Sequence, residues 1–273
     1  MNSLEVRMSD LLLVERRGDV SVVTINRPEQ RNALGFGDDG DIVEAHARAL
    51  NADRTVRCVI ITGAGSAFSA GGDVKQLRQW AHDPSVKASD FLKLYEAGIH
   101  KVIRGFWSLE MPVIAAINGP AIGLGNDLGC LADMRVAAAS AKFGATFLKI
   151  GLVPGDGGAW ILPRIIGWER AAELYFTGKI IDASTALDWG LVGRVVPDDS
   201  LMDEAMAIAE MICQQPPEVL RATKKLMRAS ILQGFEDIMS LSARYQVMAH
   251  LTDDHREALD AHHERRHPEF FGR

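Results

Sequence analysis

The sequence predicts an α/β protein with a mostly parallel sheet, followed by a region built from helices. Strand and helix patterns alternate over about the first 165 of the 273 residues. Several of the strands are continuous apolar runs, which are typical of strands buried on both faces of a sheet. From Gly167 onward the patterns are almost entirely helical. With 47% apolar and 24% charged residues, the chain can bury a full core.

The first two strands are expected to form a hairpin. Leu11–Arg16 and Val20–Ile25 flank the turn Arg17-Gly18-Asp19, and the second run is rich in β-branched residues. Apolar residues at helical spacing follow between Ile42 and Leu50, and Cys58–Thr62 has the length and composition of a buried strand. This strand–helix–strand order predicts a right-handed crossover between parallel strands.

Two further cycles extend the predicted sheet. An amphipathic segment from Phe91 to Trp107 precedes the strand Pro112–Ile117, and Asp127–Ala132 precedes the strand Met134–Ala138. The helical region beyond is interrupted at Gly178, Gly190, Pro197 and Pro216-Pro217. Because this region is too small to form a hydrophobic core of its own, we expect its apolar faces to pack on the α/β core or on another copy of the chain. A homo-oligomer is therefore predicted.

Charge and hydropathy exclude several classes of protein. A formal net charge of −6 and a pI near 5.8 give no global attraction to nucleic acid, so no nucleic-acid partner is expected. The segment Met1–Asp10 carries charges and lacks a signal-peptide core, and no segment approaches the roughly 20 apolar residues of a membrane helix. We therefore expect no membrane association and a cytoplasmic location.

The cysteines and histidines suggest neither a disulfide framework nor a metal site. The three cysteines lie far apart without CxxC spacing and are expected to be buried thiols: Cys58, Cys130 and Cys213. The histidine cluster of the carboxyl-terminal segment belongs to a charged tail, where solvated side chains are more common than converging ligands: His262, His263 and His267. No metal is expected.

Two glycine-rich loops follow two of the predicted strands. One is Gly63–Asp73, after the strand Cys58–Thr62, and the other is Asn118–Asp127, after the strand Pro112–Ile117. In α/β sheets ligands bind at the carboxyl ends of strands, where free N–H groups of helix N-termini favour negative charge. Neither loop fits GxGxxG, because Phe68 stands where the last glycine of that motif would be in the first loop and the second departs from it as well. GxxxxGK[ST] and GxSxG are also absent.

Five ordered motifs, spread over nearly the whole chain, resemble those of the crotonase (enoyl-CoA hydratase/isomerase) family. They are Asn26–Leu34, Phe68–Lys75, Pro112–Gly119, Gly151–Gly158 and Thr177-Gly178. The resemblance implies an α/β fold of the crotonase-like (ClpP/crotonase) type, a spiral of ββα units over residues 1–195. It also implies a helical trimerisation region over residues 196–273, and a homotrimer or a dimer of trimers.

The resemblance further implies an acyl-CoA substrate whose thioester oxygen is held by the backbone amides of Gly72 and Leu124. Drawing a proton from such a thioester places charge on this oxygen, and fixed donors stabilise it by roughly 3–4 kcal/mol each. Coenzyme A is part of the substrate, and no other cofactor is implied. The alternative is that both loops are tight turns without a role in catalysis.

The same comparison suggests which residues hold the CoA moiety. Four lie near the adenine and pantetheine in the family, namely Ala70, Asp73, Val74 and Lys75. Arg31 would reach phosphate, and Arg265 matches a position that reaches CoA across the subunit contact. Each charged member of this set could equally be a solvated surface group.

The acidic residues depart from the family pattern. The first catalytic glutamate of the hydratases falls on Asp127, where the helix dipole is expected to favour the ionised form, although an acid at a helix start is common. The second falls on Phe147, which cannot move protons. Asp156, in the loop Pro154–Gly158, offers a replacement, although Asp-Gly is also a frequent turn. Beside an aromatic wall at Phe147, such an acid would have a raised pKa.

The function predicted from these residues is enoyl-CoA hydratase or isomerase chemistry through an enolate, with Asp127 and Asp156 shuttling protons. Two alternatives stay open. One is a C–C hydrolase of a β-diketone that does not use CoA, suggested by Val153–Gly157, and the other is a non-catalytic scaffold, suggested by the missing glutamate. The acyl chain and the pathway are not predicted.

Overall fold

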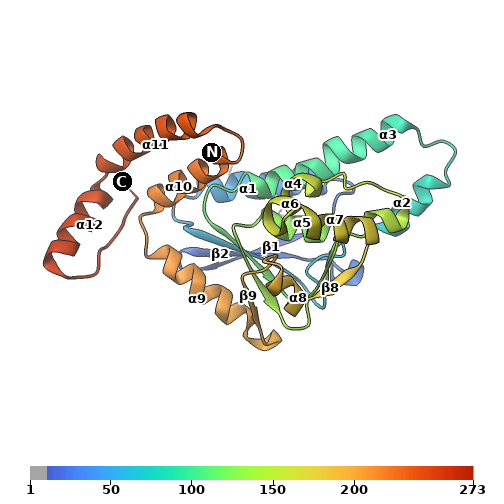
Figure 1. Cartoon of the computed structure of the whole chain (residues 1–273), viewed down its shortest axis with the longest axis horizontal. Helices are drawn as coiled ribbons and strands as arrows, with labels where there is room; N and C mark the ends of the chain where they lie inside the picture. The colour runs from blue at the N-terminus through green and yellow to red at the C-terminus, as the bar shows by residue number, and fades with distance from the viewer. Residues whose placement is uncertain (1–10, 273) are drawn as a thin grey trace, which may run out of the picture.

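The computed structural model describes residues 11–272 and centres on a six-stranded sheet (Figure 1). Its strand order is β1-β2-β3-β4-β6-β9, and every neighbouring pair is parallel except β1 and β2. The strands are β1 Leu12–Arg17, β2 Val20–Ile25, β3 Cys58–Gly63, β4 Val113–Ile117, β6 Met134–Ala138 and β9 Arg194–Val196. The predicted hairpin and the predicted mostly parallel sheet are therefore confirmed. The prediction about Met1–Asp10 concerns residues outside the described range.

The sheet is covered on both faces, which explains the continuous apolar runs of its central strands. Every residue of β3 and β4 is buried. On one face, Val59 and Ile61 of β3 belong to the large core beneath the helices between β2 and β6. On the other face, Cys58 and Ile60 pack in a second core with Leu201 and neighbouring residues of α9.

The α-helices between β2 and β9 in the chain, two of which follow the glycine-rich loops, connect the strands. They are α1 Asp39–Ala52, α2 Val74–Ala81, α3 Ala88–Lys93, α4 His100–Trp107, α5 Leu124–Leu131, α6 Gly158–Ile166, α7 Trp168–Thr177 and α8 Ala183–Asp188. Short 3-10 turns occur at Pro28–Gln30, Phe147–Ile150 and Asp198–Ser200. The predicted amphipathic segment 91–107 is continuous in space, but its middle, Leu94–Ile99, is a π-helix rather than an α-helix.

A second, three-stranded sheet lies beside the first, in the order β5-β7-β8. Its strands are β5 Ala121–Ile122, β7 Lys142–Gly144 and β8 Ile180–Asp182. β8 and β9 correct the prediction that the chain is almost purely helical after Gly167. Both strands have three residues, too few for an alternating pattern, so their pairing is decided by contacts with β7 and β6 that are distant in sequence.

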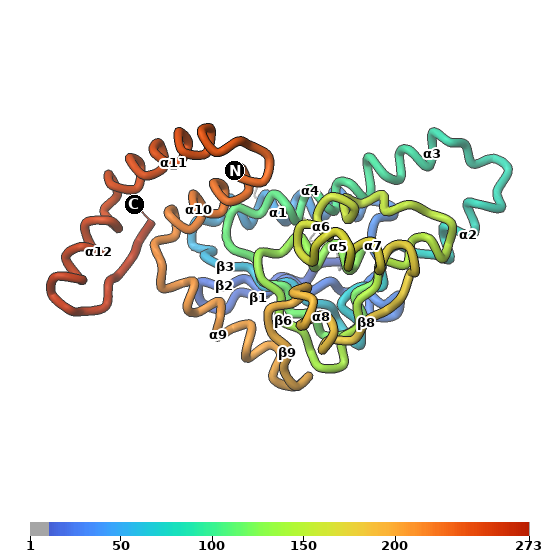
Figure 2. The backbone as a smooth tube through the Cα atoms, viewed as in Figure 1, coloured from blue at the N-terminus to red at the C-terminus, as the bar shows by residue number. Residues whose placement is uncertain are grey.

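The last two helices, α11 Phe235–His250 and α12 Asp253–Glu264, extend from the body at the end opposite to α2 and α3 (Figure 2). The preceding helices lie against the body: α9 Leu201–Cys213 packs on the sheet, and α10 Pro217–Ser230 is held by its buried side chains Arg221 and Lys224, which donate to the carbonyls of Val56 and Met111. Within the described chain, α11 buries none of its residues, and Phe235, Val247 and Leu251 on or next to it are exposed. The division of the chain at residue 195 stays a prediction.

Other predictions from composition can be compared with the structure. Cys58 and Cys130 are buried free thiols, as predicted, but Cys213 is half-buried because it lies at the exposed end of α9. His262 and His263 are exposed in the last turn of α12. In the part of the chain that the structure describes, no helix is long and apolar enough to cross a membrane.

Candidate active site

The two glycine-rich loops meet at the carboxyl ends of β3 and β4. Ser69 forms an isolated parallel bridge with Ala121, and the Ile122 N–H donates to the Ser69 carbonyl at 3.0 Å. Glycine is required at this contact. A Cβ on Gly125 would lie 2.1 Å from the Ser69 carbonyl oxygen, and one on Gly71 (φ 91°) would lie 2.6 Å from that of Ile122. The small residues noted in the sequence therefore let the two backbones touch.

The backbone amides of Gly72 and Leu124, which lie at this junction, have no acceptor among residues 11–272. Their neighbours are satisfied, because the Gly71 N–H donates to Ser69 Oγ at 3.2 Å and the Gly123 N–H donates to the Gly144 carbonyl at 2.8 Å. Leu124 is the first residue of α5, where N–H groups lack partners inside the helix. The loops are close together, since the Cβ position of Gly71 is 3.2 Å from the Leu124 nitrogen.

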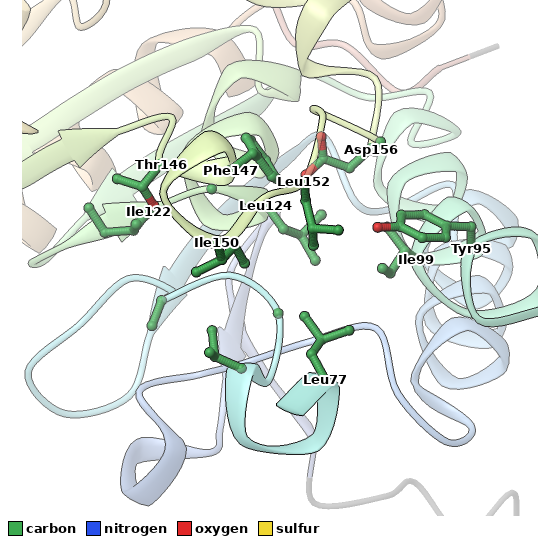
Figure 3. A pocket seen from close by; sticks show the side chains of 15 residues that line it. Leu77, Tyr95, Ile99, Ile122, Leu124, Thr146, Phe147, Ile150, Leu152 and Asp156 are labelled. Carbon is green, nitrogen blue, oxygen red and sulfur yellow. The ribbon is translucent and has the colours of Figure 1, made fainter. Parts of the chain in front are cut away.

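Gly72 and Leu124 line one cavity of about 570 Å³, measured with its open mouth (Figure 3). Most of the other lining side chains are apolar, including Leu77, Ile99, Ile122, Phe147, Ile150 and Leu152. Three polar side chains also line it, namely Tyr95, Thr146 and Asp156. A largely apolar cavity with a few polar groups and free amides is the usual form of a small-molecule site.

Asp156 and Asp127 are buried side by side, but only Asp156 lines the cavity. Asp127 is 1% exposed and Asp156 is 3% exposed, and their side chains are hydrogen-bonded to each other. Two carboxyl groups can form such a bond only when they share a proton. The sequence predicted both residues as acids of the site, and the structure brings them together with Asp127 behind Asp156.

Of the two carboxyl groups, Asp127 is the one whose surroundings favour the protonated form. Burial, and then the charge of Asp156, raise the pKa of Asp127 well above its ordinary value. Burial also raises the pKa of Asp156, but hydrogen bonds from Asp127 and from the Gly158 N–H lower it. The expectation that the helix dipole keeps Asp127 ionised is therefore wrong. A dipole contributes about 0.3–1 kcal/mol, whereas full burial shifts a carboxyl by up to about 3–5 pKa units.

Tyr175 is a member of this cluster that the sequence analysis missed. Its hydroxyl is buried and has no hydrogen-bond partner among the described residues, and burial followed by the charges of Asp127 and Asp156 raises its pKa. Its ring packs against Phe147, with the centroids 6.4 Å apart. Tyr175 lies two residues before the motif Thr177-Gly178, but spacing alone does not show that α7 turns it toward Asp127.

Gly158 is the residue that makes room for the cluster. A Cβ there would lie 1.8 Å from Asp127 Oδ2 and 2.6 Å from the Tyr175 hydroxyl. Replacement by alanine is expected to displace the buried carboxyl and destabilise the fold by about 1–3 kcal/mol. Thermal or urea unfolding measures this effect. Gly193→Ala is the matched control, because its Cβ would meet only the Arg135 carbonyl oxygen at 3.6 Å. Equal stability of the two variants would contradict the proposed crowding.

The residues predicted to hold CoA are only partly gathered at the cavity. Ala70 and Val74 line it. Asp73 instead caps α2, because its side chain accepts hydrogen bonds from the Lys75 N–H at 2.9 Å and the Gln76 N–H at 3.1 Å. The side chains of Lys75 and Arg31 are exposed near the first loop.

Arg265 is exposed at the carboxyl end of α12, far from α2 in the same chain (Figure 1). It does not line the cavity that contains Gly72 and Leu124. Within residues 11–272, no three histidine, cysteine or acidic side chains lie close enough together to hold a metal ion.

Comparison with known proteins gives a consistent result over the whole fold. The family model described as enoyl-CoA hydratase/isomerase matches residues 15–273. A protein of Escherichia coli K12 named 1,2-epoxyphenylacetyl-CoA isomerase is 34% identical, with 97% of this chain and 100% of that protein covered. An enoyl-CoA hydratase of Mycobacterium tuberculosis H37Rv is 36% identical, with 96% of each chain covered.

A solved structure supports the same assignment. The crystal structure of an enoyl-CoA hydratase from Bacillus anthracis superposes with a TM-score of 0.89 at 32% identity, over 96% of this chain and 100% of that one. The fold and these comparisons thus define an enzyme of the crotonase type. The chain belongs to the enoyl-CoA hydratase/isomerase family.

Proposed function

We propose that this enzyme isomerises acyl-CoA thioesters by moving a proton along the acyl chain, with Asp156 as the base. The observation that carries the proposal is that Asp156 is the only carboxyl group among the described residues lining the cavity. The amides of Gly72 and Leu124 line the same cavity. A single base that removes a proton from one carbon and returns it to another needs no second acid facing the substrate.

The reaction follows from these groups. The thioester oxygen accepts hydrogen bonds from the Gly72 and Leu124 amides, and the Asp156 carboxylate removes a proton from the α-carbon of a 3-enoyl-CoA. The electron pair of the broken C–H bond delocalises into the thioester as an enolate, whose oxygen the two amides stabilise. Asp156 then returns the proton to the γ-carbon, so the double bond moves to the 2-position and the carboxylate is regenerated.

Asp127 supports this step without contacting the substrate. It keeps its own proton and donates it in a hydrogen bond to Asp156, which helps to hold the base in its ionised form. The apolar wall that includes Phe147 and Leu152 limits the water around Asp156. Hydration is less well supported, because a water molecule would need its own activating group, and Phe147 stands at the second glutamate position.

The CoA moiety and the assembly are part of the proposal. Ala70 and Val74 lie against pantetheine, Asp73 and Lys75 lie near the adenine, and Arg31 meets phosphate. Arg265 is provided by another subunit, since in its own chain it lies far from the cavity. The exposed apolar residues of α11 support contact between copies in a homotrimer or a dimer of trimers.

The assay that tests the proposal compares three substrates. We expect turnover of 3-enoyl-CoA or 3,5-dienoyl-CoA to exceed hydration of crotonyl-CoA. Faster hydration would contradict the single-base mechanism. Calorimetry with acetyl-CoA tests the CoA site, since the absence of binding would favour a β-diketone hydrolase. Binding without turnover of any thioester would favour a non-catalytic scaffold.

A further inference from the structure

Tyr95 is a polar side chain of the cavity that has no role in the proposed isomerisation. It comes from the π-helix Leu94–Ile99, and its hydroxyl points into the open space of the cavity (Figure 3). Among residues 11–272 this hydroxyl has no hydrogen-bond partner, although the ring lies beside His100, with the centroids 6.0 Å apart. The hydroxyl therefore has its full hydrogen-bonding capacity available to a ligand.

The position of the ring is fixed by the loop that carries Asp156. A Cβ on Gly155 would lie 2.7 Å from Tyr95 Cε1, so glycine lets the ring lie directly against the loop. His100, one residue after the π-helix, contacts the same loop through Nε2, 2.8 Å from the Gly155 carbonyl oxygen. π-Helical turns are frequent at functional sites because they redirect a side chain inside a helix.

Apart from Asp156 and the ring of His100, the surroundings of Tyr95 are apolar. Ile99 and Leu77 line the adjacent wall, whereas Thr146 lies at the other end of the cavity beside Ile122 (Figure 3). Burial, and then the charge of Asp156, raise the pKa of the Tyr95 hydroxyl. The group therefore keeps its proton and is a hydrogen-bond donor.

We propose that Tyr95 selects acyl groups that carry an oxygen atom, as hydroxyl or carbonyl, in the part of the chain beyond the reacting carbons. This inference rests on the proposed binding of acyl-CoA, in which those carbons lie beside Asp156. A hydrocarbon chain would strip water from the hydroxyl and leave it unpaired, which disfavours binding, whereas an oxygen at that place would accept its hydrogen bond.

Binding of unreactive saturated ligands tests the inference without turnover. We would titrate the enzyme with hexanoyl-CoA and with its 4-oxo, 5-oxo and 6-hydroxy derivatives by calorimetry. At least one oxygenated ligand is expected to bind roughly tenfold more tightly than hexanoyl-CoA. Tyr95→Phe keeps the ring and is expected to abolish this preference while leaving the affinity for hexanoyl-CoA unchanged or improved. Tyr245→Phe, on α11 and outside the cavity, is the matched control and should retain the preference.

The outcomes separate the two proposals. Equal affinities of the wild-type enzyme for all four ligands, or an unchanged preference in Tyr95→Phe, would overturn the role of Tyr95 and leave the isomerase proposal standing. If none of the four ligands binds, the proposed acyl-CoA site is wrong, and the proposed selectivity of Tyr95 is wrong as well.

Discussion

Replacing Asp156 with asparagine is expected to reduce kcat for isomerisation by roughly 10²- to 10⁴-fold, the usual contribution of a positioned general base. Asparagine has nearly the same size but cannot accept the proton. The base is reached by substrate from the same cavity that contains the Gly72 and Leu124 amides, so binding of CoA thioesters should change little. Steady-state kinetics with 3-enoyl-CoA, together with calorimetric titration of acetyl-CoA, measures both quantities.

Asp188→Asn is the matched control for this variant. Asp188 is exposed on α8 and does not line the cavity, so the same change of side chain there should leave kcat within about twofold. Retention of near wild-type activity by Asp156→Asn would remove Asp156 as the base. Loss of acetyl-CoA binding together with kcat would assign it to binding instead.

The pH dependence of the wild-type enzyme gives a second readout of the same base. Asp156 accepts a proton only when ionised, and its pKa is raised by burial. The value of kcat/KM is therefore expected to fall as the pH decreases through this raised pKa, above the range of about 3.9 for a free aspartate. An acid limb that lies at or below that range would contradict the burial of the functional carboxylate.

The sequence predicted the framework of the site because local patterns encode it. The strands β3 and β4 are apolar runs followed by glycine-rich loops, and parallel strands bring their carboxyl ends to one edge. Those rules are enough to place the loops of Gly72 and Leu124 together. The short strands β8 and β9 were missed because their pairing depends on partners about 40 or more residues earlier in the chain.

The protonation states of Asp127 and Asp156 could not be predicted from the sequence, for a different reason. Asp127 is in the first turn of α5, as predicted, and the local rule for that position gives an ionised acid. Burial and the nearby Asp156 act against this rule, because both raise the pKa of Asp127. Both depend on how α6 packs on α5. Tyr175 and Tyr95 were missed likewise, since neither belongs to a motif and only the packing of α7 and of the π-helix turns them toward Asp127 and the cavity.

Replacing Leu124 with proline is expected to lower kcat/KM by roughly 10²- to 10³-fold, because it deletes one of the two amides that would hold the enolate oxygen. Leu124 is the first residue of α5, the position where proline is tolerated best in a helix. Gly123 before it is not helical (φ 56°, ψ −121°), so the conflict between proline and a preceding helical residue does not arise.

Leu124→Ala is the control that isolates the amide from the side chain. Both variants lose the same buried leucine side chain, which is 3% exposed, but only alanine keeps the N–H group. Their melting temperatures should therefore be similar, while kcat/KM with 3-enoyl-CoA separates them. If the two variants are equally active, the Leu124 amide does not stabilise the transition state, and the oxyanion would have to be held by Gly72 with some other donor.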